Sequence, residues 1–302
     1  MNDNSNLFGN GFGVALATPF LPEGAIDEQG LVRLVQHVVH GGADFLVALG
    51  STGEAAMLDE SERQRVVAIV AEHRGDAKLI VGTGTSSTAA TCTWTKTAQQ
   101  SGADGALIVM PSYTKPTQAG IVAHFKAVAE AVPDMPLIAY NVPSRTGVNL
   151  TPATVRELWR IPTVVALKES SGDLLQITRI AAELPEGRTL LAGDDGLLLA
   201  TIAVGGHGVV SVAGNVVPQS MRELLQAARA SDFATARQLQ ATLQPLFDAL
   251  SLEPNPIPIK AALALAGMAY SAPRLPLMAA TEATRNALRP ALQQTRALTI
   301  HV

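Results

Sequence analysis

Lys168 is the residue whose place in the sequence most needs a chemical explanation. It ends Val164-Val165-Ala166-Leu167, an apolar run typical of a buried strand. Burying a charged lysine is costly unless the amine loses its proton or gains a partner. A free lysine has a pKa of about 10.4, and a fall of roughly three units would make a neutral amine nearly a thousandfold more abundant at pH 7. Such an amine can attack a ketone. The alternative is a lysine that extends to solvent or pairs with Glu169.

Side chains at the ends of other apolar runs could assist such an amine. Ser51 and Thr52 follow one run, Tyr113 follows another, and Tyr140 and Arg145 belong to a third. Imine chemistry needs this set: a phenol to move protons, hydroxyls to relay them, and a guanidinium to bind a carboxylate. Taken singly, each has a structural alternative, as a core tyrosine, a solvated arginine or a turn with a helix cap.

Apolar runs and amphipathic segments alternate along the chain and indicate eight β/α units. The predicted strands are Gly13–Thr18, Phe45–Gly50, Leu79–Gly84, Ala106–Met110, Leu137–Asn141, Val164–Lys168, Thr189–Gly193 and Val209–Val212. The predicted helices between them are 27–41, 59–74, 86–101, 117–132, 151–160, 173–184 and 196–204, with caps at Asp27, Asp59, Ser86, Thr151 and Asp173. Strands that are apolar on both faces are typical of a parallel sheet covered by helices. The pattern therefore favours an α/β fold, a closed (β/α)8 TIM barrel, over a doubly wound sheet.

The barrel is expected to span residues 11–217, after a disordered N-terminal tail over residues 1–10. From Pro218 onward helical patterns replace strands, at about 218–230, 232–250, 257–268 and 276–297. Residues 218–302 are thus predicted to form a C-terminal helical region packed on the barrel. Because chemistry in this fold gathers at the carboxyl ends of the strands, Gly193 and Val210 on strands seven and eight join the candidate substrate-binding residues.

Composition excludes several classes of function. A net charge of −4 and the lack of a basic run argue against nucleic acid as a partner. The single cysteine, Cys92, rules out an internal disulfide framework, and the first residues lack a signal-peptide pattern, so a cytoplasmic location is expected. No uninterrupted apolar window predicts a membrane span. The six histidines are scattered and Asp194-Asp195 alone is a poor ligand set, so no metal site is expected.

Four ordered motifs resemble the dihydrodipicolinate synthase and N-acetylneuraminate lyase superfamily over nearly the whole chain. They are Gly50-Ser51-Thr52-Gly53-Glu54, the Tyr140–Gly147 segment, Leu167-Lys168-Glu169 and the Gly205–Ser211 segment. The resemblance implies a class I enzyme that needs no metal or organic cofactor. Its lysine, Lys168 here, would form a Schiff base with the ketone of pyruvate.

The resemblance also implies a role for each of the other candidates. Tyr140 would donate and accept protons, Thr52 would bind the carboxylate of pyruvate, and Ser51 would replace a relay threonine. Tyr113 would be lent to the site by a neighbouring subunit, which implies a dimer at least and usually a homotetramer built as a dimer of dimers. Arg145 would meet the carboxylate of a second substrate, L-aspartate 4-semialdehyde.

The second substrate stays open between branches of the superfamily. Ser-Arg-Thr-Gly at 144–147, Asn-Pro-Ile-Pro-Ile-Lys at 255–260 and Arg-Leu-Pro at 274–276 resemble the synthase branch, which serves lysine and diaminopimelate biosynthesis. Ser51, however, is also usual in the lyase branch and in sugar-acid aldolases. Another pyruvate-dependent aldolase, a keto-acid dehydratase or a non-catalytic keto-acid sensor therefore remain alternatives.

Feedback inhibition by lysine is not expected. In regulated members of the resembling family, lysine binds at the dimer interface against polar and aromatic side chains. The matching positions in this chain are Glu60, Arg63, Ser86, Ala90 and Ser112. Ala90 replaces the carboxylate that would meet the α-amino group of lysine, and Ser112 replaces the aromatic wall.

Overall fold

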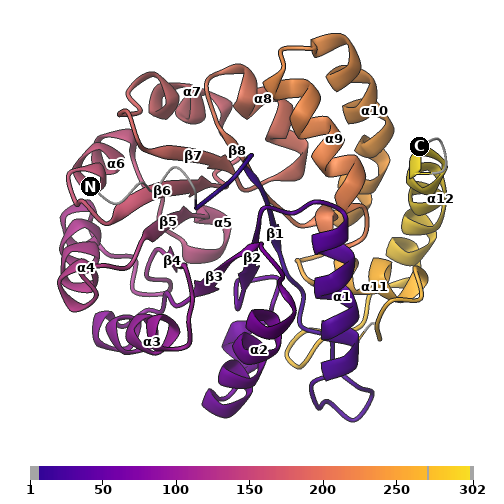
Figure 1. Cartoon of the computed structure of the whole chain (residues 1–302), viewed down its shortest axis with the longest axis horizontal. Helices are drawn as coiled ribbons and strands as arrows, with labels where there is room; N and C mark the ends of the chain where they lie inside the picture. The colour runs from indigo at the N-terminus through magenta and orange to yellow at the C-terminus, as the bar shows by residue number, and fades with distance from the viewer. Residues whose placement is uncertain (1–6, 271, 300–302) are drawn as a thin grey trace.

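Eight parallel strands close into a barrel in the computed structural model, which describes residues 7–270 and 272–299. The strands are β1 (Phe12–Ala15), β2 (Phe45–Ala48), β3 (Lys78–Gly82), β4 (Gly105–Val109), β5 (Leu137–Asn141), β6 (Val164–Glu169), β7 (Thr189–Ala192) and β8 (Gly208–Ser211). Each strand pairs with the next along the chain, and β8 pairs with β1. Figure 1 shows this ring at the centre of the molecule with helices around it. The predicted TIM barrel is confirmed.

Eight helices form the outer layer of the barrel. They are α1 (Glu28–His40), α2 (Glu60–His73), α3 (Thr88–Gln100), α4 (Gln118–Ala131), α6 (Pro152–Trp159), α7 (Leu174–Ala182), α8 (Leu198–Ala203) and α9 (Pro218–Arg229). Four of the five predicted caps accept a hydrogen bond from the first helical turn, namely Asp27, Asp59, Thr151 and Asp173. Helix α3 is capped by Ser87 rather than Ser86, because the Ser86 hydroxyl donates instead to the carbonyl of Ser112.

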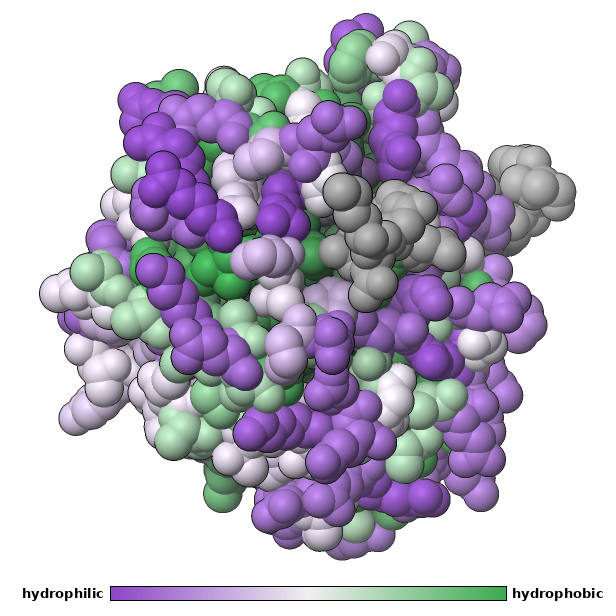
Figure 2. Space-filling view, turned by 60° about the vertical axis from the view of Figure 1, so that its left-hand side comes forward, coloured by the Kyte–Doolittle hydropathy of each residue, from purple (hydrophilic) through white to green (hydrophobic). Residues whose placement is uncertain are grey.

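Four short elements after strands were missed from the sequence, since each is too short to show a helical period. They are η2 (Ala55–Met57), α5 (Pro143–Thr146), η3 (Asp195–Leu197) and η4 (Ala213–Asn215). All follow strand ends on the side where the candidate residues lie. The outer helices expose their polar faces: on the side shown in Figure 2, hydrophilic residues cover most of the surface and hydrophobic ones show mainly in the hollows between them.

The amino end of the barrel is filled by the start of the described chain. Leu7 and Phe8 are buried with the side chains of the barrel interior, and the Phe8 ring meets the Phe45 ring edge to face at 5.4 Å. The predicted disordered tail is therefore wrong for residues 7–10, because two large apolar side chains there gain burial. Residues 1–6 lie outside the described residues.

The C-terminal region packs on the barrel, as predicted, but it begins later than residue 218. Helix α9 contacts β1 and β8 and so completes the eighth β/α unit. The extension consists of α10 (Phe233–Leu250), α11 (Ile257–Leu265) and α12 (Glu282–Thr299). Helix α10 packs on α8, α9 and η3, and α11 packs on η4. Figure 1 shows these helices together on one side of the barrel.

Candidate active site

Lys168 lies inside the barrel at the carboxyl end of β6. Only 4% of its surface is exposed, so the lysine does not extend to solvent. Its register partner on β5 is Tyr140, and the Lys168 amine lies 4.3 Å from the centre of the Tyr140 ring. The Lys168 side chain is therefore buried in the barrel, and its amine lies against the ring of a phenol.

Glu169 is not the partner of Lys168. Successive side chains on a strand point to opposite faces, and Glu169 faces the helices rather than the barrel interior. There its carboxylate accepts hydrogen bonds from the Asn141 amide at 3.0 and 3.1 Å and from the Ser171 backbone at 2.7 Å. Burial raises the pKa of Glu169, against the opposing effect of these donors. Pairing between neighbours in sequence, one of the alternatives for Lys168, is thus excluded.

A cavity of about 510 Å³ opens above the Lys168 amine. Its wall combines strand ends and loops of the barrel with the end of α10 and the segment that follows it. Most of the predicted site residues line it, namely Ser51, Thr52, Tyr140, Arg145, Lys168 and Gly193. The extension adds side chains that were not singled out from the sequence, among them Gln244, Phe247, Ser251 and Asn255. The cavity therefore belongs to both parts of the fold.

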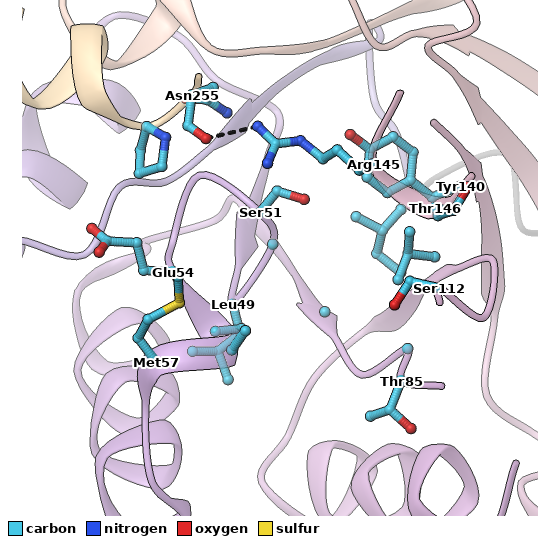
Figure 3. Close-up of a pocket in the computed structure, with 18 of the residues that line it drawn as sticks. Leu49, Ser51, Glu54, Met57, Thr85, Ser112, Tyr140, Arg145, Thr146 and Asn255 are labelled. Carbon is cyan, nitrogen blue, oxygen red and sulfur yellow. Dashed lines mark hydrogen bonds between the residues drawn. The ribbon is translucent and has the colours of Figure 1, made fainter. Parts of the chain in front are cut away.

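Thr52 and Arg145 meet at Asn255. Thr52 is 2% exposed, and its hydroxyl oxygen accepts a hydrogen bond of 2.9 Å from the Asn255 side-chain amide. Arg145, on α5, also lines this cavity, and its guanidinium donates to the backbone carbonyl of Asn255 at 2.7 Å (Figure 3). Hydroxyl and guanidinium groups suited to two carboxylates thus face the same space as the amine.

Gly193 and Val210 were both predicted to bind substrate, but only Gly193 lines the cavity. A Cβ at Gly193 would lie 1.8 Å from the Ser170 hydroxyl and 3.0 Å from Cε of Lys168, so a glycine leaves the room that the lysine occupies. Val210 does not line the cavity, and its predicted binding role receives no support. Its side chain lies one layer deeper in the barrel interior, and Val212, two residues on, reaches the cavity wall instead.

Tyr113 lies away from Lys168 in the single chain. Tyr113 does not line the Lys168 cavity, and 92% of its surface is exposed. Its φ of +68° lies in the left-handed region that non-glycine residues rarely adopt. A large aromatic side chain that is held in a strained, fully exposed position gains nothing from its own chain. Its predicted role requires a second copy.

A second cavity, of about 460 Å³, adjoins the first and shares Ser51, Tyr140, Arg145 and Asn255 with it. Figure 3 shows it between the β2 loop and the loops that carry Thr85 and Ser112. Of the positions matched to a lysine-binding pocket, Arg63, Ser86 and Ser112 line this cavity, whereas Glu60 and Ala90 do not. The Ser86 and Ser112 hydroxyls hydrogen-bond to each other at 3.1 Å.

Two carboxylates at the end of β7 were considered from the sequence only as metal ligands. Burial raises the pKa of Asp194, its effect opposed by the charge of Lys168. Asp195 accepts hydrogen bonds from the backbone N–H groups of Val212 (3.0 Å) and Ala213 (2.7 Å) and so ties the β7 and β8 ends together. Within the described part of the chain, no group of three or more His, Cys, Asp or Glu side chains could hold a metal ion.

A buried ion pair joins the β2 loop to the extension. Lys260 on α11 is 1% exposed and pairs with Glu54, which also accepts a hydrogen bond of 2.9 Å from the Arg274 backbone. The Lys260 amine lies 3.9 Å from the centre of the Phe20 ring. Burial lowers the pKa of Lys260 to about 8, against the attraction of Glu54. Glu54 and Lys260 each belong to a motif identified in the sequence, but the sequence did not indicate that the two side chains meet.

In the described residues, no helix is long and apolar enough to cross a membrane.

Comparisons with known proteins agree with this geometry. The model of the dihydrodipicolinate synthetase family matches residues 9–295. The 4-hydroxy-tetrahydrodipicolinate synthase of Thermosynechococcus vestitus is 46% identical over 92% of this chain and 94% of its own. The dihydrodipicolinate synthase of Aquifex aeolicus superposes with a TM-score of 0.91 at 40% identity, covering 95% of this chain and 98% of that one. The chloride-inhibited enzyme of Acinetobacter baumannii in complex with pyruvate gives 0.92 at 38% identity, covering 95% and 99%. The family model and these relatives match nearly the whole chain, and Lys168, Tyr140 and Thr52 lie around one cavity. The chain therefore belongs to the dihydrodipicolinate synthetase family.

Proposed function

We propose that this chain catalyses the reaction of 4-hydroxy-tetrahydrodipicolinate synthase, the condensation of pyruvate with L-aspartate 4-semialdehyde. The observation that carries the proposal is the buried Lys168 amine beside Tyr140, in a cavity that also holds a hydroxyl and a guanidinium. The relative from Thermosynechococcus vestitus bears the name of this activity and matches the chain almost end to end. The enzyme would be a lyase of lysine and diaminopimelate biosynthesis.

In the first step, the Lys168 amine attacks the ketone carbon of pyruvate and forms a C–N bond. The former ketone oxygen leaves as water, and Tyr140 is placed to give it the proton it needs. The Thr52 hydroxyl is buried at the wall of the same cavity and would donate to the pyruvate carboxylate. Ser51, the next residue on the β2 loop, would relay the proton to and from Tyr140.

In the second step, loss of a proton from the former methyl group of pyruvate gives an enamine. Its carbon attacks the aldehyde carbon of the second substrate, and the new alkoxide takes up a proton. The amino group of the second substrate then attacks the imine carbon, closes the ring and releases the Lys168 amine. Arg145, at the mouth of the cavity, would bind the carboxylate of the second substrate.

This chemistry calls for no metal or organic cofactor, because the imine nitrogen of Lys168 accepts the electron pair that develops during proton loss. The proposal includes a homotetramer built as a dimer of dimers, in which Tyr113 of one copy completes the relay of another. Its exposure and backbone strain support this arrangement. It also includes a cytoplasmic location, where pyruvate and the aldehyde are available.

Two measurements test the proposal. Borohydride reduction in the presence of pyruvate, followed by mass measurement, should add one reduced pyruvate adduct at Lys168, whereas a keto-acid sensor would gain no mass. Purified protein should then turn over pyruvate with L-aspartate 4-semialdehyde and should not cleave sialic acid or 2-keto-3-deoxy sugar acids. Turnover of a sugar acid without condensation would assign the chain to another aldolase activity.

A further inference from the structure

Asn255 contacts both halves of the candidate site. It lies between α10 and α11, 203 residues after Thr52, and lines both cavities. Its side-chain amide donates to the Thr52 hydroxyl oxygen at 2.9 Å, and its backbone carbonyl accepts from the Arg145 guanidinium at 2.7 Å. Figure 3 shows Arg145 directed at Asn255 across the cavity. One residue therefore joins the group expected to bind pyruvate to the group expected to bind the aldehyde.

The bond to Thr52 has a direction. A threonine hydroxyl has one hydrogen to donate and two lone pairs, whereas the NH2 group of an asparagine can only donate. With a lone pair engaged by Asn255, the hydroxyl hydrogen of Thr52 remains for another acceptor. Because Thr52 lines the Lys168 cavity and is 2% exposed, that hydrogen is available to a ligand bound in the cavity. A carboxylate oxygen is the acceptor that gains most from such a donor.

The segment that carries Asn255 is fixed to the same loop a second time. Lys260, five residues further on, forms the buried ion pair with Glu54, two residues after Thr52. Glu54 adopts a left-handed backbone with a φ of +54°. Residues 255 and 260 thus hold residues 52 and 54 on either side of Gly53. This double attachment fixes the position of the Thr52 hydroxyl more closely than one hydrogen bond would.

We propose that Asn255 is a positioning residue for both substrates. Its side chain orients the Thr52 hydroxyl toward the carboxylate of pyruvate, and its backbone carbonyl holds the Arg145 guanidinium in place for the carboxylate of the aldehyde. The proposal rests on the proposed function above. Substitution of the Asn255 side chain can separate these two contacts. It removes the hydrogen bond to Thr52 but keeps the backbone carbonyl that accepts from Arg145.

Asn255→Ala should therefore raise KM for pyruvate and leave KM for the aldehyde within about twofold. A hydrogen bond to a charged group, once its donor is misoriented, typically costs roughly 10- to 100-fold in affinity. Asn255→Asp should cost more than Asn255→Ala, because the new carboxylate would accept the Thr52 hydrogen and repel the pyruvate carboxylate. Ser251→Asp is the matched control: it adds the same charge to the cavity wall, but the Ser251 hydroxyl donates to the backbone carbonyl of Phe247 rather than to Thr52.

A double-mutant cycle with Thr52→Val decides whether Asn255 acts through Thr52. The pyruvate concentration for half-maximal borohydride trapping is measured for wild type, Asn255→Ala, Thr52→Val and the double variant, so that no turnover is needed. Thermal unfolding of each variant reports whether the fold is kept. The double variant should trap pyruvate no worse than Thr52→Val alone.

The outcomes separate this inference from the proposed function. If wild type traps no pyruvate, the proposed function itself fails. If wild type traps pyruvate but Asn255→Ala shifts the half-maximal concentration equally in the presence and absence of the Thr52 hydroxyl, the positioning role is wrong. An Asn255→Asp effect no larger than that of Ser251→Asp would reduce the role of Asn255 to general electrostatics and would likewise overturn it.

Discussion

Lys260→Met is expected to destabilise the fold strongly, although Lys260 touches no substrate in the proposed reaction. The variant keeps an unbranched side chain of similar length and removes the charge. Glu54 would then remain with 0% of its side chain exposed and without its cation. Removing one partner of a buried ion pair typically costs about 3–5 kcal/mol, because the remaining charge is left desolvated and unpaired. The loss of the contact between the Lys260 amine and the Phe20 ring adds to this cost.

The structure also predicts how the loss can be recovered. Glu54→Gln in addition to Lys260→Met removes the stranded charge and keeps an acceptor for the Arg274 backbone N–H, which lies 2.9 Å from the Glu54 carboxylate. The double variant should therefore be more stable than Lys260→Met alone, with a coupling energy of roughly 2 kcal/mol. A gain of this kind would not follow if Lys260 contributed only by filling space.

Urea denaturation, followed by circular dichroism at one protein concentration, measures these differences. Arg65→Met is the control, since Arg65 pairs with Glu28 at the surface with 52% and 46% of the two side chains exposed. Exposed pairs contribute little, so this variant should unfold close to wild type. A loss below about 1 kcal/mol for Lys260→Met would refute the reasoning, since it would place Glu54 in contact with water or another cation.

Lys168→Ala should abolish turnover and borohydride trapping while unfolding no earlier than wild type, because the amine becomes a bond in the intermediate; residual turnover would contradict its role. Tyr113→Phe subunits mixed with Lys168→Ala subunits should regain activity, because each mixed interface rebuilds one intact site; no recovery would argue against donation between copies. Glu169→Gln should gain stability relative to wild type as pH rises. Burial raises the pKa of Glu169 in the folded state, so the wild-type protein loses stability relative to the variant as pH rises from the unfolded-state pKa through the folded-state pKa. The loss is up to about 1.4 kcal/mol per pH unit. A stability difference between the two proteins that did not change with pH in urea denaturation would count against this. L-Lysine below about 1 mM should leave activity unchanged, because Ala90 supplies no carboxylate for its α-amino group; an inhibition titration with a midpoint below that concentration would show that the matched positions are wrong.

The sequence predicted the barrel well because each strand is buried on both faces and so appears as an unbroken apolar run. The carboxyl ends were less accurate, and for a physical reason. The predicted strand Phe45–Gly50 ends at Ala48, since Leu49 has a left-handed backbone with a φ of +57° and leaves the sheet. Apolar composition continues past the last ladder residue, because the loop is buried as well. Hydropathy therefore cannot mark the residue at which a strand becomes part of the site.

Lys168 and Tyr140 could be predicted as neighbours because parallel strands bring their carboxyl ends together. Asn255 could not, since no periodicity relates it to Thr52, 203 residues earlier. The same holds for Lys260 and Glu54, which are 206 residues apart and whose burial, not their composition, makes them a pair. Local pattern predicts elements, whereas contacts between distant loops follow from how those elements pack.

The extension is part of the active site rather than a separate covering. The barrel provides Lys168 and Tyr140 but leaves one side of the space above them open, and Phe247, Ser251 and Asn255 form that side. The extension after α9 therefore contributes to the site in two ways: it closes one side of the cavity that Lys168 lines, and through Asn255 it contacts both Thr52 and Arg145.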